Sequence, residues 1–306
     1  MAVKTLKQKG LTWVNIDKMD DESFNYLKTN FKFHHLDYED LRGGKQTPKI
    51  DIYKNYLFLI LHIPQWKNST HSINNAELGF FIGEGYLITI QHGHSKLMKN
   101  FFYRCMKNPT VKKNWMDKGS GYLMYKIIDA LFHDTQPIIE NIGKQIFKLE
   151  ENIFKGEQDS ETVKQLAIYR RNILRFRRII DPQRYLISNL SHIRKNFLDE
   201  NLSIYFDDIN DYLSKIWSIT DTYKDTIDGL HVTVDSLMNH KTNKTINALT
   251  VISVALMPLT LFSGIYGMNV TGLPHAEDPI WVWLMFLGLA AIIVLILIIL
   301  KKRKWL

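Results

Sequence analysis

The chain has 306 residues, of which 45% are hydrophobic and 23% charged, close to the average of folded globular domains. This composition excludes a disordered tail, a fibrous repeat and a disulfide-stapled small domain. The one cysteine, Cys105, excludes an intrachain disulfide and a structural zinc finger. A formal net charge of +8 suits either nucleic acid or an anionic membrane surface as a partner, so the placement of the apolar residues has to decide.

Residues 1–121 mix short strand patterns with helical ones and predict a cytoplasmic α/β or α+β domain. Strands are expected over 11–17, 56–63, 78–81 and 86–90, and a helix over 21–30. The region contains no Gly-rich phosphate loop and no nucleophile elbow. Its histidine pairs, His34 with His35 and His92 with His94, are more typical of surface or capping residues than of a transition-metal site.

Residues 122–245 predict long antiparallel helices that end in a stalk helix. The stalk is expected to begin near Asn201 and to continue without a break into the membrane, about 100 Å in all at 1.5 Å per residue. Its apolar residues recur at spacings of three and four, which predicts a coiled-coil-like seam. The members of this seam are Tyr205, Ile209, Tyr212, Ile216, Ile219, Tyr223, Ile227, Leu230, Val234 and Leu237.

Acidic residues open the stalk and recur along it. Asp207, Asp208 and Asp211 stand at its start, and the later members are Asp221, Asp225, Asp228 and Asp235. Such a row can form a cation sensor if carboxylates of neighbouring subunits meet, because a divalent cation relieves their repulsion. A solvated helix face is an equally good interpretation.

A basic run, YRRNILRFRRII over 169–180, has the opposite sign. It can lie against lipid headgroups, pair with acidic neighbours, or be solvated. Nucleic-acid binding is disfavoured because no base-stacking aromatic platform accompanies the run.

Two long uncharged segments near the C-terminus predict transmembrane helices over 246–266 and 281–300, joined by an outer loop over 267–280. Trp281 and Trp283 stand at one edge of the second span and the cluster KKRK (301–304) at the other, as in interface anchoring. A buried helical hairpin of a soluble core is the alternative. We therefore predict a third domain, 246–306, that crosses the lipid bilayer twice.

The basic residues set the expected orientation. Lys241 and Lys244 precede the first span and the KKRK cluster follows the second, whereas the loop between the spans has no Lys or Arg. Positive residues concentrate on the cytoplasmic side, so both termini are expected in the cytoplasm and the protein in the cell membrane. The first thirteen residues lack the apolar stretch of a signal peptide, which agrees with this orientation.

The first span carries small and polar residues along one stripe. They are Asn243, Asn247, Thr250, Ser253, Met257, Thr260 and Gly264. Such a stripe can line a pore or can pack the two spans against each other. Because one hairpin cannot enclose a pore, the pore interpretation requires a homo-oligomer.

Gly267-Met268-Asn269 follows directly on Tyr266 at the outer end of this span, after the stretch MPLT (257–260) and before a last span that ends in KKRKWL. In this arrangement the chain resembles the CorA-type divalent-cation transporter family. Segments 33–64 and 86–90 are also similar to the cytoplasmic domain of that family, so the resemblance covers essentially the whole chain.

The resemblance implies a homopentameric transporter that takes Mg²⁺, and with it Co²⁺, into the cytoplasm, with no catalytic cofactor and no enzymatic activity. Gly267, Met268 and Asn269 would form the ion-selectivity motif. Positions that match the family's pore are Asn243, Leu249, Met257, Thr260 and Gly264, and Asp208 lies near its regulatory acidic residue, where Mg²⁺ would also act as a regulatory ligand.

The chemistry of the motif supports an ion role independently. Mg²⁺ loses its waters reluctantly, so neutral oxygens that bind the hydrated ion suit rapid passage better than carboxylates. A ring of Asn269 amides from several subunits would present such oxygens, and Gly267 would free the backbone to turn. A Gly-Asn cap at the end of the helix, without an ion role, remains the structural alternative.

The loop after the motif departs from the usual magnesium pattern. Its Gly-Leu-Pro turn (272–274) resembles the ZntB-like zinc branch of the superfamily, and His275 would favour a softer metal. Glu277 and Asp278 can gather cations at the outer mouth. Zn²⁺ is therefore the second candidate cargo, and a membrane-anchored cytoplasmic binding or scaffold protein is the alternative from another class.

Overall fold

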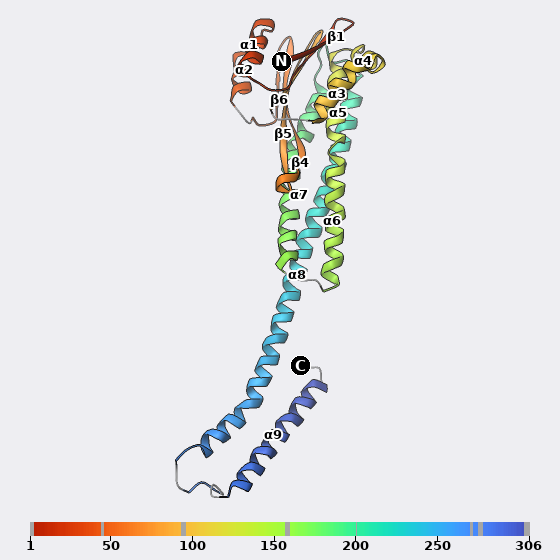
Figure 1. Ribbon diagram of the computed structural model, residues 1–306. Coiled ribbons are helices and arrows are strands. Elements are labelled where there is room, and N and C mark those ends of the chain that lie inside the picture. The colour runs from red at the N-terminus through yellow and green to blue at the C-terminus, as the bar shows by residue number, and fades with distance from the viewer. Residues whose placement is uncertain are drawn as a thin grey trace. The chain divides into compact units, whose positions relative to one another are not determined.

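The computed structural model describes residues 3–43, 46–92, 96–156, 160–199, 201–269, 272–274 and 278–302. The chain forms two compact units, Met1–His231 and Val232–Leu306, which are described separately below (Figure 1). An α/β domain is followed by long helices, and the last of these is continuous with the first of two C-terminal apolar helices, as predicted.

The first unit contains a six-stranded mixed sheet in the order β1-β2-β6-β5-β4-β3. Only the pair β2 and β6 is parallel among the described strands. The predicted strands are all present, but two are much longer than expected because β4 and β5 pair along twelve residues each. The strands are β1 Val3–Gln8, β2 Leu11–Ile16, β3 Lys49–Ile52, β4 Tyr56–Lys67, β5 Ser72–Gly83 and β6 Tyr86–His92.

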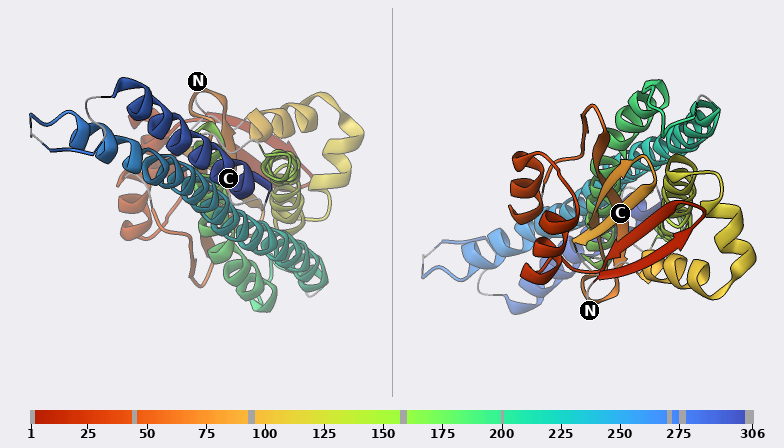
Figure 2. Two further views of the ribbon diagram at one scale, coloured as in Figure 1. Left: turned by 90° about the horizontal axis from the view of Figure 1, so that it is seen from below. Right: turned by 90° about the horizontal axis from the view of Figure 1, so that it is seen from above.

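Side chains along each strand point alternately to the two faces of the sheet, and both faces are buried. Helices α1 (Asp21–Asn30) and α2 (His35–Arg42) cover one face, where Phe24 and Leu27 pack with Val14 and Phe58. Trp13, the neighbour of Val14 in β2, points to the opposite face and packs edge-on against Phe102 of α3 (Lys96–Lys107), with ring centroids 4.8 Å apart. Figure 2 shows α1 and α2 on one side of the sheet and α3 with α4 (Pro109–Met116) on the other.

A two-stranded extension of the sheet is attached to α7 (Ser160–His192). Strand β3 pairs with β4 only up to Ile60, and β6 pairs with β5 only from Glu77, so the far ends of β4 and β5 lack outer partners. Two fully buried side-chain amides of α7 supply hydrogen-bond partners for the backbone at these edges. Gln183 accepts a hydrogen bond from the backbone N–H of His62 at 3.2 Å, and Asn172 bonds Ile73 N at 3.3 Å and His71 O at 3.0 Å.

The long helices that follow the sheet are α5 (Ser120–His133), α6 (Gln136–Phe154), α7 and α8 (Leu202–Tyr266). Helices α7 and α8 run antiparallel, because residues later in α7 contact residues earlier in α8. Arg170 bonds Asp228, Arg177 bonds Asp221 and Arg184 bonds Ser214.

The buried seam of α8 differs in part from the predicted one. Phe206, Leu213 and Thr220 are buried, whereas Tyr205 is 38% exposed and Tyr212 only half-buried. Ile209 and Ile216 belong to both the predicted and the observed seam. The buried residues and the predicted tyrosines lie beside them on the helix at helical spacing. Tyr205 therefore lies on a more exposed flank, whereas the Tyr212 Oη atom is itself buried, and burial raises the pKa of this tyrosine to about 12.

The second unit contains the C-terminal part of α8 and helix α9 (Pro279–Lys302). Both helices are long and apolar enough to cross a membrane. Their most apolar windows have 0% and 6% of their residues buried, so these segments are not the core of a soluble domain.

Candidate functional site

The stripe of small and polar residues in α8 lies on an exposed face of the second unit. Among the predicted pore residues on this face, Leu249 is 64% exposed and Met257 is 71% exposed. The other predicted pore residues are also exposed: Asn243, Ser253, Thr260 and Gly264. At 100° per residue, all six fall on one side of the helix.

The opposite side of α8 packs against α9. Its partly covered residues recur at spacings of three and four: Ala248, Val251, Ala255, Leu259, Phe262 and Tyr266. Phe262 and Phe286 have ring centroids 6.3 Å apart, and the Tyr266 Oη atom lies 3.9 Å from Met285 Sδ. The stripe therefore does not pack this hairpin together, and it stays uncovered in a single chain.

Two hydroxyl groups in this part of α8 are bonded within the helix. Thr260 Oγ1, on the stripe, donates to Leu256 O at 3.2 Å, and Ser263 Oγ, which is not part of the stripe, donates to Thr260 O at 3.1 Å. Such local bonds let hydroxyl residues sit in apolar surroundings without losing a hydrogen bond. A shallow hollow on the same side is lined by Met257, Thr260, Leu261, Gly264, Ile265 and Met268.

The motif Gly267-Met268-Asn269 continues directly from the last turn of α8. Gly267 N donates to Ser263 O at 2.9 Å and Met268 N donates to Ile265 O at 3.3 Å, so the helix is closed by its own carbonyls. A Cβ atom on Gly267 would lie 2.9 Å from Ser263 O, closer than side chains tolerate. All three motif residues are exposed, and Asn269 is the first residue beyond this closing turn.

The described part of the outer loop is held at both ends. Tyr266 Oη donates to Pro274 O at 3.0 Å, and the carbonyl of Asp278 accepts from Trp281 N at 3.1 Å at the start of α9. Gly272 has φ of +97°, a conformation that favours glycine. The predicted mouth residue Glu277, together with His275, lies outside the described residues, as do residues 303–306 of the basic tail.

The acidic residues that open α8 are exposed in the first unit. Asp207, Asp208 and Asp211 form no ion pair within the described part of the chain. Asp208 adds to the negative charge near Tyr125, whose pKa is raised to about 12 chiefly by burial. The three carboxylates are therefore free to bind a cation, which is what a sensor would require.

Two of the later acidic residues of α8, Asp221 and Asp228, are paired with the basic run of α7. Arg177 Nη1 bonds Asp221 Oδ1 at 2.5 Å, and Arg170 Nε bonds Asp228 Oδ1 at 2.8 Å. Arg177 also lies 4.8 Å from the ring centre of Trp217. Of the three interpretations of this run, the structure supports pairing with acidic neighbours for Arg170 and Arg177.

The histidine pairs do not form a metal site in the described residues. His34 caps α2, its Nδ1 accepting from Leu36 N at 3.4 Å, and its ring lies beside that of His35. The side chain of His92, like the whole of His94, lies outside the description.

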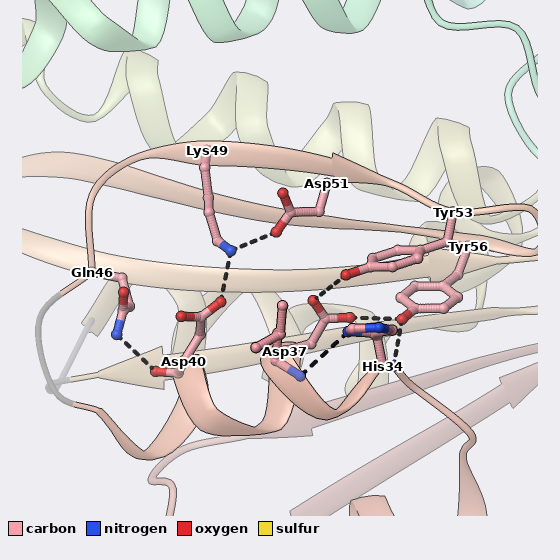
Figure 3. A network of polar contacts seen from close by, with 9 residues as sticks. His34, Asp37, Asp40, Gln46, Lys49, Asp51, Tyr53 and Tyr56 are labelled. Carbon is pink, nitrogen blue, oxygen red and sulfur yellow. Dashed lines mark hydrogen bonds and ion pairs between the residues drawn. The ribbon is translucent and has the colours of Figure 1, made fainter.

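Sequence reasoning missed one acidic group in the first unit, made by Asp37, Asp40 and Asp51 (Figure 3). Lys49 Nζ bonds Asp40 at 2.6 Å and Asp51 at 2.5 Å, and so occupies the space between them. The buried Asp37 accepts from Tyr53 Oη at 2.8 Å and Tyr56 Oη at 2.6 Å.

Burial raises the pKa of Asp37, and burial next to this carboxyl raises the pKa of Tyr53 to about 12. The group is thus an internally bonded network. The spacing of Asp37 and Asp40 on one helix offered a signal for it, but the contribution of β3 depends on the tertiary fold.

Comparisons with known proteins agree with this architecture. The model of the family described as CorA-like Mg²⁺ transporter protein matches residues 8–303. The cobalt/magnesium transport protein CorA of Thermotoga maritima is 28% identical over 301 residues, which cover 96% of this chain and 83% of that protein.

A second relative, the zinc transport protein ZntB of Yersinia pseudotuberculosis, is 21% identical over 294 residues, which cover 96% of this chain and 88% of that protein. The solved complete structure of the CorA magnesium transporter from Methanocaldococcus jannaschii shares the fold. It superposes with a TM-score of 0.80 over 98% of this chain and 93% of that one, at 22% identity.

Proposed function

The chain thus belongs to the family of CorA-like Mg²⁺ transporter proteins, and we propose that it forms a homo-oligomeric pore in the cell membrane that admits Mg²⁺ to the cytoplasm. The observation that carries this proposal is the uncovered stripe of uncharged residues on α8, which leads to Gly267, Met268 and Asn269 and faces away from α9. An enzyme is not expected, since the named relatives are transporters.

A closed ring of copies is the simplest arrangement that covers this stripe. In a ring of α8 helices, the six exposed residues would face a common axis while α9 would face lipid. The family resemblance favours a pentamer. The lipid bilayer, divalent cations and further copies of the chain are then its partners, and nucleic acid is not.

Selectivity in this proposal comes from Asn269. A ring of its amide oxygens would bind the waters of Mg²⁺ rather than replace them, because this ion sheds its waters slowly. Gly267 keeps the last turn of α8 closed at a point where any side chain would press on Ser263 O. The motif is therefore held at a defined height above the stripe.

Closure is assigned to the apolar members of the stripe. Leu249 and Met257 would narrow the pore to an apolar constriction that excludes hydrated ions by dewetting. The driving force for uptake is the membrane potential, worth about 4.6 kcal/mol for a divalent ion at 100 mV, negative inside. The basic residues Lys241, Lys244 and the KKRK cluster favour cytoplasmic termini.

Regulation is assigned to Asp207, Asp208 and Asp211. In a ring these exposed, unpaired carboxylates would approach a neighbouring subunit, and Mg²⁺ at millimolar concentration would bind there and hold the stalks closed. The ion is thus both cargo and regulatory ligand, and Co²⁺ is expected to share the pathway. No catalytic cofactor is required.

Zn²⁺ is the second candidate cargo. The Gly-Leu-Pro turn at 272–274 favours it, with Gly272 in a conformation that glycine supplies, and one relative is named as a zinc transport protein. With Zn²⁺ as cargo, the direction of transport and its energy source would be open.

Ion flux into proteoliposomes tests these alternatives directly. The purified full chain is reconstituted with an ion-specific dye inside, and Mg²⁺ and Zn²⁺ are compared under an inside-negative potential. We expect Mg²⁺ entry that is lost in Asn269→Ala. Zn²⁺ entry without Mg²⁺ would assign the chain to the zinc branch, and no flux of either ion from intact oligomers would favour the membrane-anchored scaffold.

A further inference from the structure

Positive charge is concentrated in one part of the first unit, around α3 and α4. Segment 96–118 has a single acidic residue, Asp117, and seven basic ones: Lys96, Lys99, Arg104, Lys107, Lys112, Lys113 and Lys118. Asp117 is already bonded to the β1–β2 turn, by Lys9 Nζ at 2.9 Å and Gln8 Nε2 at 3.0 Å. It therefore offsets little of the charge of its own segment.

The described cations of this segment have no acidic partners. Within the described chain, no ion pair involves the side chains of Lys99, Arg104, Lys107, Lys112, Lys113 or Lys118. Two of them lie over aromatic rings instead, with Lys118 Nζ 4.6 Å from the centre of Tyr122 and Arg104 Cζ 5.6 Å from that of Trp115. Figure 2 shows α3 and α4 at the side of the sheet away from α1 and α2.

Two hollows meet at Lys118, where α4 is linked to α5. The larger, about 740 Å³, lies between the β1–β2 turn, the β5–β6 turn and the segment that joins α7 to α8, and its basic residues include Arg194 and Lys195. The smaller, about 340 Å³, is lined by Lys113, Asn114, Asp117, Lys118 and Tyr122. Both volumes fall in the range of small-ligand sites, about 300–1,000 Å³.

The described lining of the larger hollow carries four basic residues, Lys9, Lys118, Arg194 and Lys195, against three acidic ones, Glu84, Asp117 and Asp199, which leaves an excess of one positive charge. Asp117 is paired with Lys9 at 2.9 Å, and Asp199 Oδ1 accepts from the backbone and side chain of Asn201, each at 3.2 Å, but keeps its charge. Lys118, Arg194 and Lys195 form no ion pair in the described residues.

We propose that these two hollows, which share Asp117 and Lys118 in their linings, bind a soluble polyphosphate anion, of the class of inorganic triphosphate and the nucleoside triphosphates. Ammonium and guanidinium groups form strong charge-assisted hydrogen bonds to phosphate oxygens, and Lys113, Lys118, Arg194 and Lys195 line the two hollows. The concave shape favours a compact anion over a flat bilayer surface or a macromolecule.

This site would give the protein a second way to sense its cargo, a regulatory consequence that rests on the proposed function. Polyphosphates are themselves Mg²⁺ ligands, so metal-free triphosphate accumulates when Mg²⁺ is scarce. A site that prefers the metal-free anion would report that shortage to the cytoplasmic domain. The binding itself does not depend on which ion the pore carries.

Isothermal titration of the full chain in detergent, with sodium tripolyphosphate and Mg²⁺-free ATP as probes, tests the proposal. We expect saturable binding with a Kd below about 1 mM. The double substitution Lys113→Glu with Lys118→Glu should weaken it at least about tenfold, because each lysine contributes a charged hydrogen bond. The milder Lys113→Gln with Lys118→Gln should lower the affinity in the same direction.

The matched control is Arg171→Glu with Arg175→Glu. Both arginines are exposed on α7 and form no ion pair within the described residues, and this change alters net charge equally. It should leave the Kd within about twofold if binding is local rather than a response to overall charge. Thermal melting of each variant verifies folding.

Several results would overturn the proposal: no saturable heat with either probe, equal loss of affinity in the α7 control, or orthophosphate binding as tightly as triphosphate. Binding of anionic phosphatidylserine vesicles that triphosphate does not displace would reassign the patch to lipid. Ion flux without triphosphate is measured in parallel, so loss of binding with intact flux counts against this site alone and not against the transporter.

Discussion

Arg170 of α7 donates to Asp228 of α8 with its Nε atom 2.8 Å from Oδ1, and so ties the basic run of one helix to the acidic row of the next. The arginine holds the pKa of Asp228 below its usual value. The bond therefore stabilises the folded chain where the carboxyl is ionised. Its contribution is present in full above about pH 5 and is lost as the pH falls below about 4 toward the lowered pKa.

Asp228→Asn should accordingly lower the melting temperature of the full chain at pH 7 by about 1–2 °C, because a pair with side chains 52% and 36% exposed is worth about 0.5 kcal/mol. The difference between the variant and the parent should shrink as the pH is lowered from 5 toward 3, because the carboxyl becomes protonated. A difference that persists unchanged at pH 3 would show that packing, and not charge, is responsible.

Gly267→Ala should impair transport. The added Cβ would approach Ser263 O to 2.9 Å, and relieving this contact should cost about 1–3 kcal/mol and displace the motif from the end of α8. Mg²⁺ flux into proteoliposomes is expected to fall at least tenfold, roughly the rate equivalent of 1.4 kcal/mol. Gly288→Ala in α9 is the matched control, because its Cβ would meet nothing within 4 Å, and parent-like flux in both variants would refute the argument.

Met257→Ser should make the closed pore leak. Met257 is 71% exposed on the stripe, and a hydroxyl in its place would wet the proposed constriction. We expect residual Mg²⁺ flux at high internal Mg²⁺ to rise several-fold, roughly the effect of about 1 kcal/mol on the closed state. Leu295→Ser, on a residue of α9 that is 58% exposed, should leave closure intact, and equal leakage in the two variants would argue against a constriction at Met257.

Asp208→Ala should weaken closure by cytoplasmic Mg²⁺. Removing one of three unpaired carboxylates at the start of α8 should shift the Mg²⁺ concentration for half-closure upward about tenfold, the equivalent of 1.4 kcal/mol of binding. Asp225→Ala provides the control, since this carboxylate is 68% exposed and bonds the adjacent Lys224. If closure by millimolar Mg²⁺ is unchanged in Asp208→Ala, that residue is not the sensor.

The helical course of the chain could be predicted from local patterns, and so could most strand positions. The helix at 21–30 matches because Asp20 caps it, accepting from Ser23 N at 2.8 Å, and because its apolar residues recur at helical spacing. The lengths of β4 and β5 could not be predicted. They depend on Asn172 and Gln183, about a hundred residues away, which satisfy the unpaired edges of both strands.

The candidate site divides in the same way. Runs of twenty uncharged residues, their basic flanks and the Gly-Met-Asn motif are local properties of the sequence. A membrane-spanning helix forms its backbone hydrogen bonds within one continuous segment, so it can be recognised from that segment alone. The sequence alone does not decide whether the basic run over 169–180 contacts lipid headgroups, acidic neighbours or solvent. Which carboxylates remain free depends on long-range pairing: Asp221 and Asp228 are bonded by α7, whereas Asp208 is not.

The sequence by itself determined the class of protein, the two apolar segments, the polar stripe and the motif at its end, since each rests on residues near one another along the chain. Only the tertiary structure decided that the stripe faces away from α9 and that the unpaired cations of α3 and α4 border a hollow near Lys118. The physical reason is that burial and charge pairing are properties of surfaces, and the surfaces of α7, α8 and α4 are assembled from distant segments.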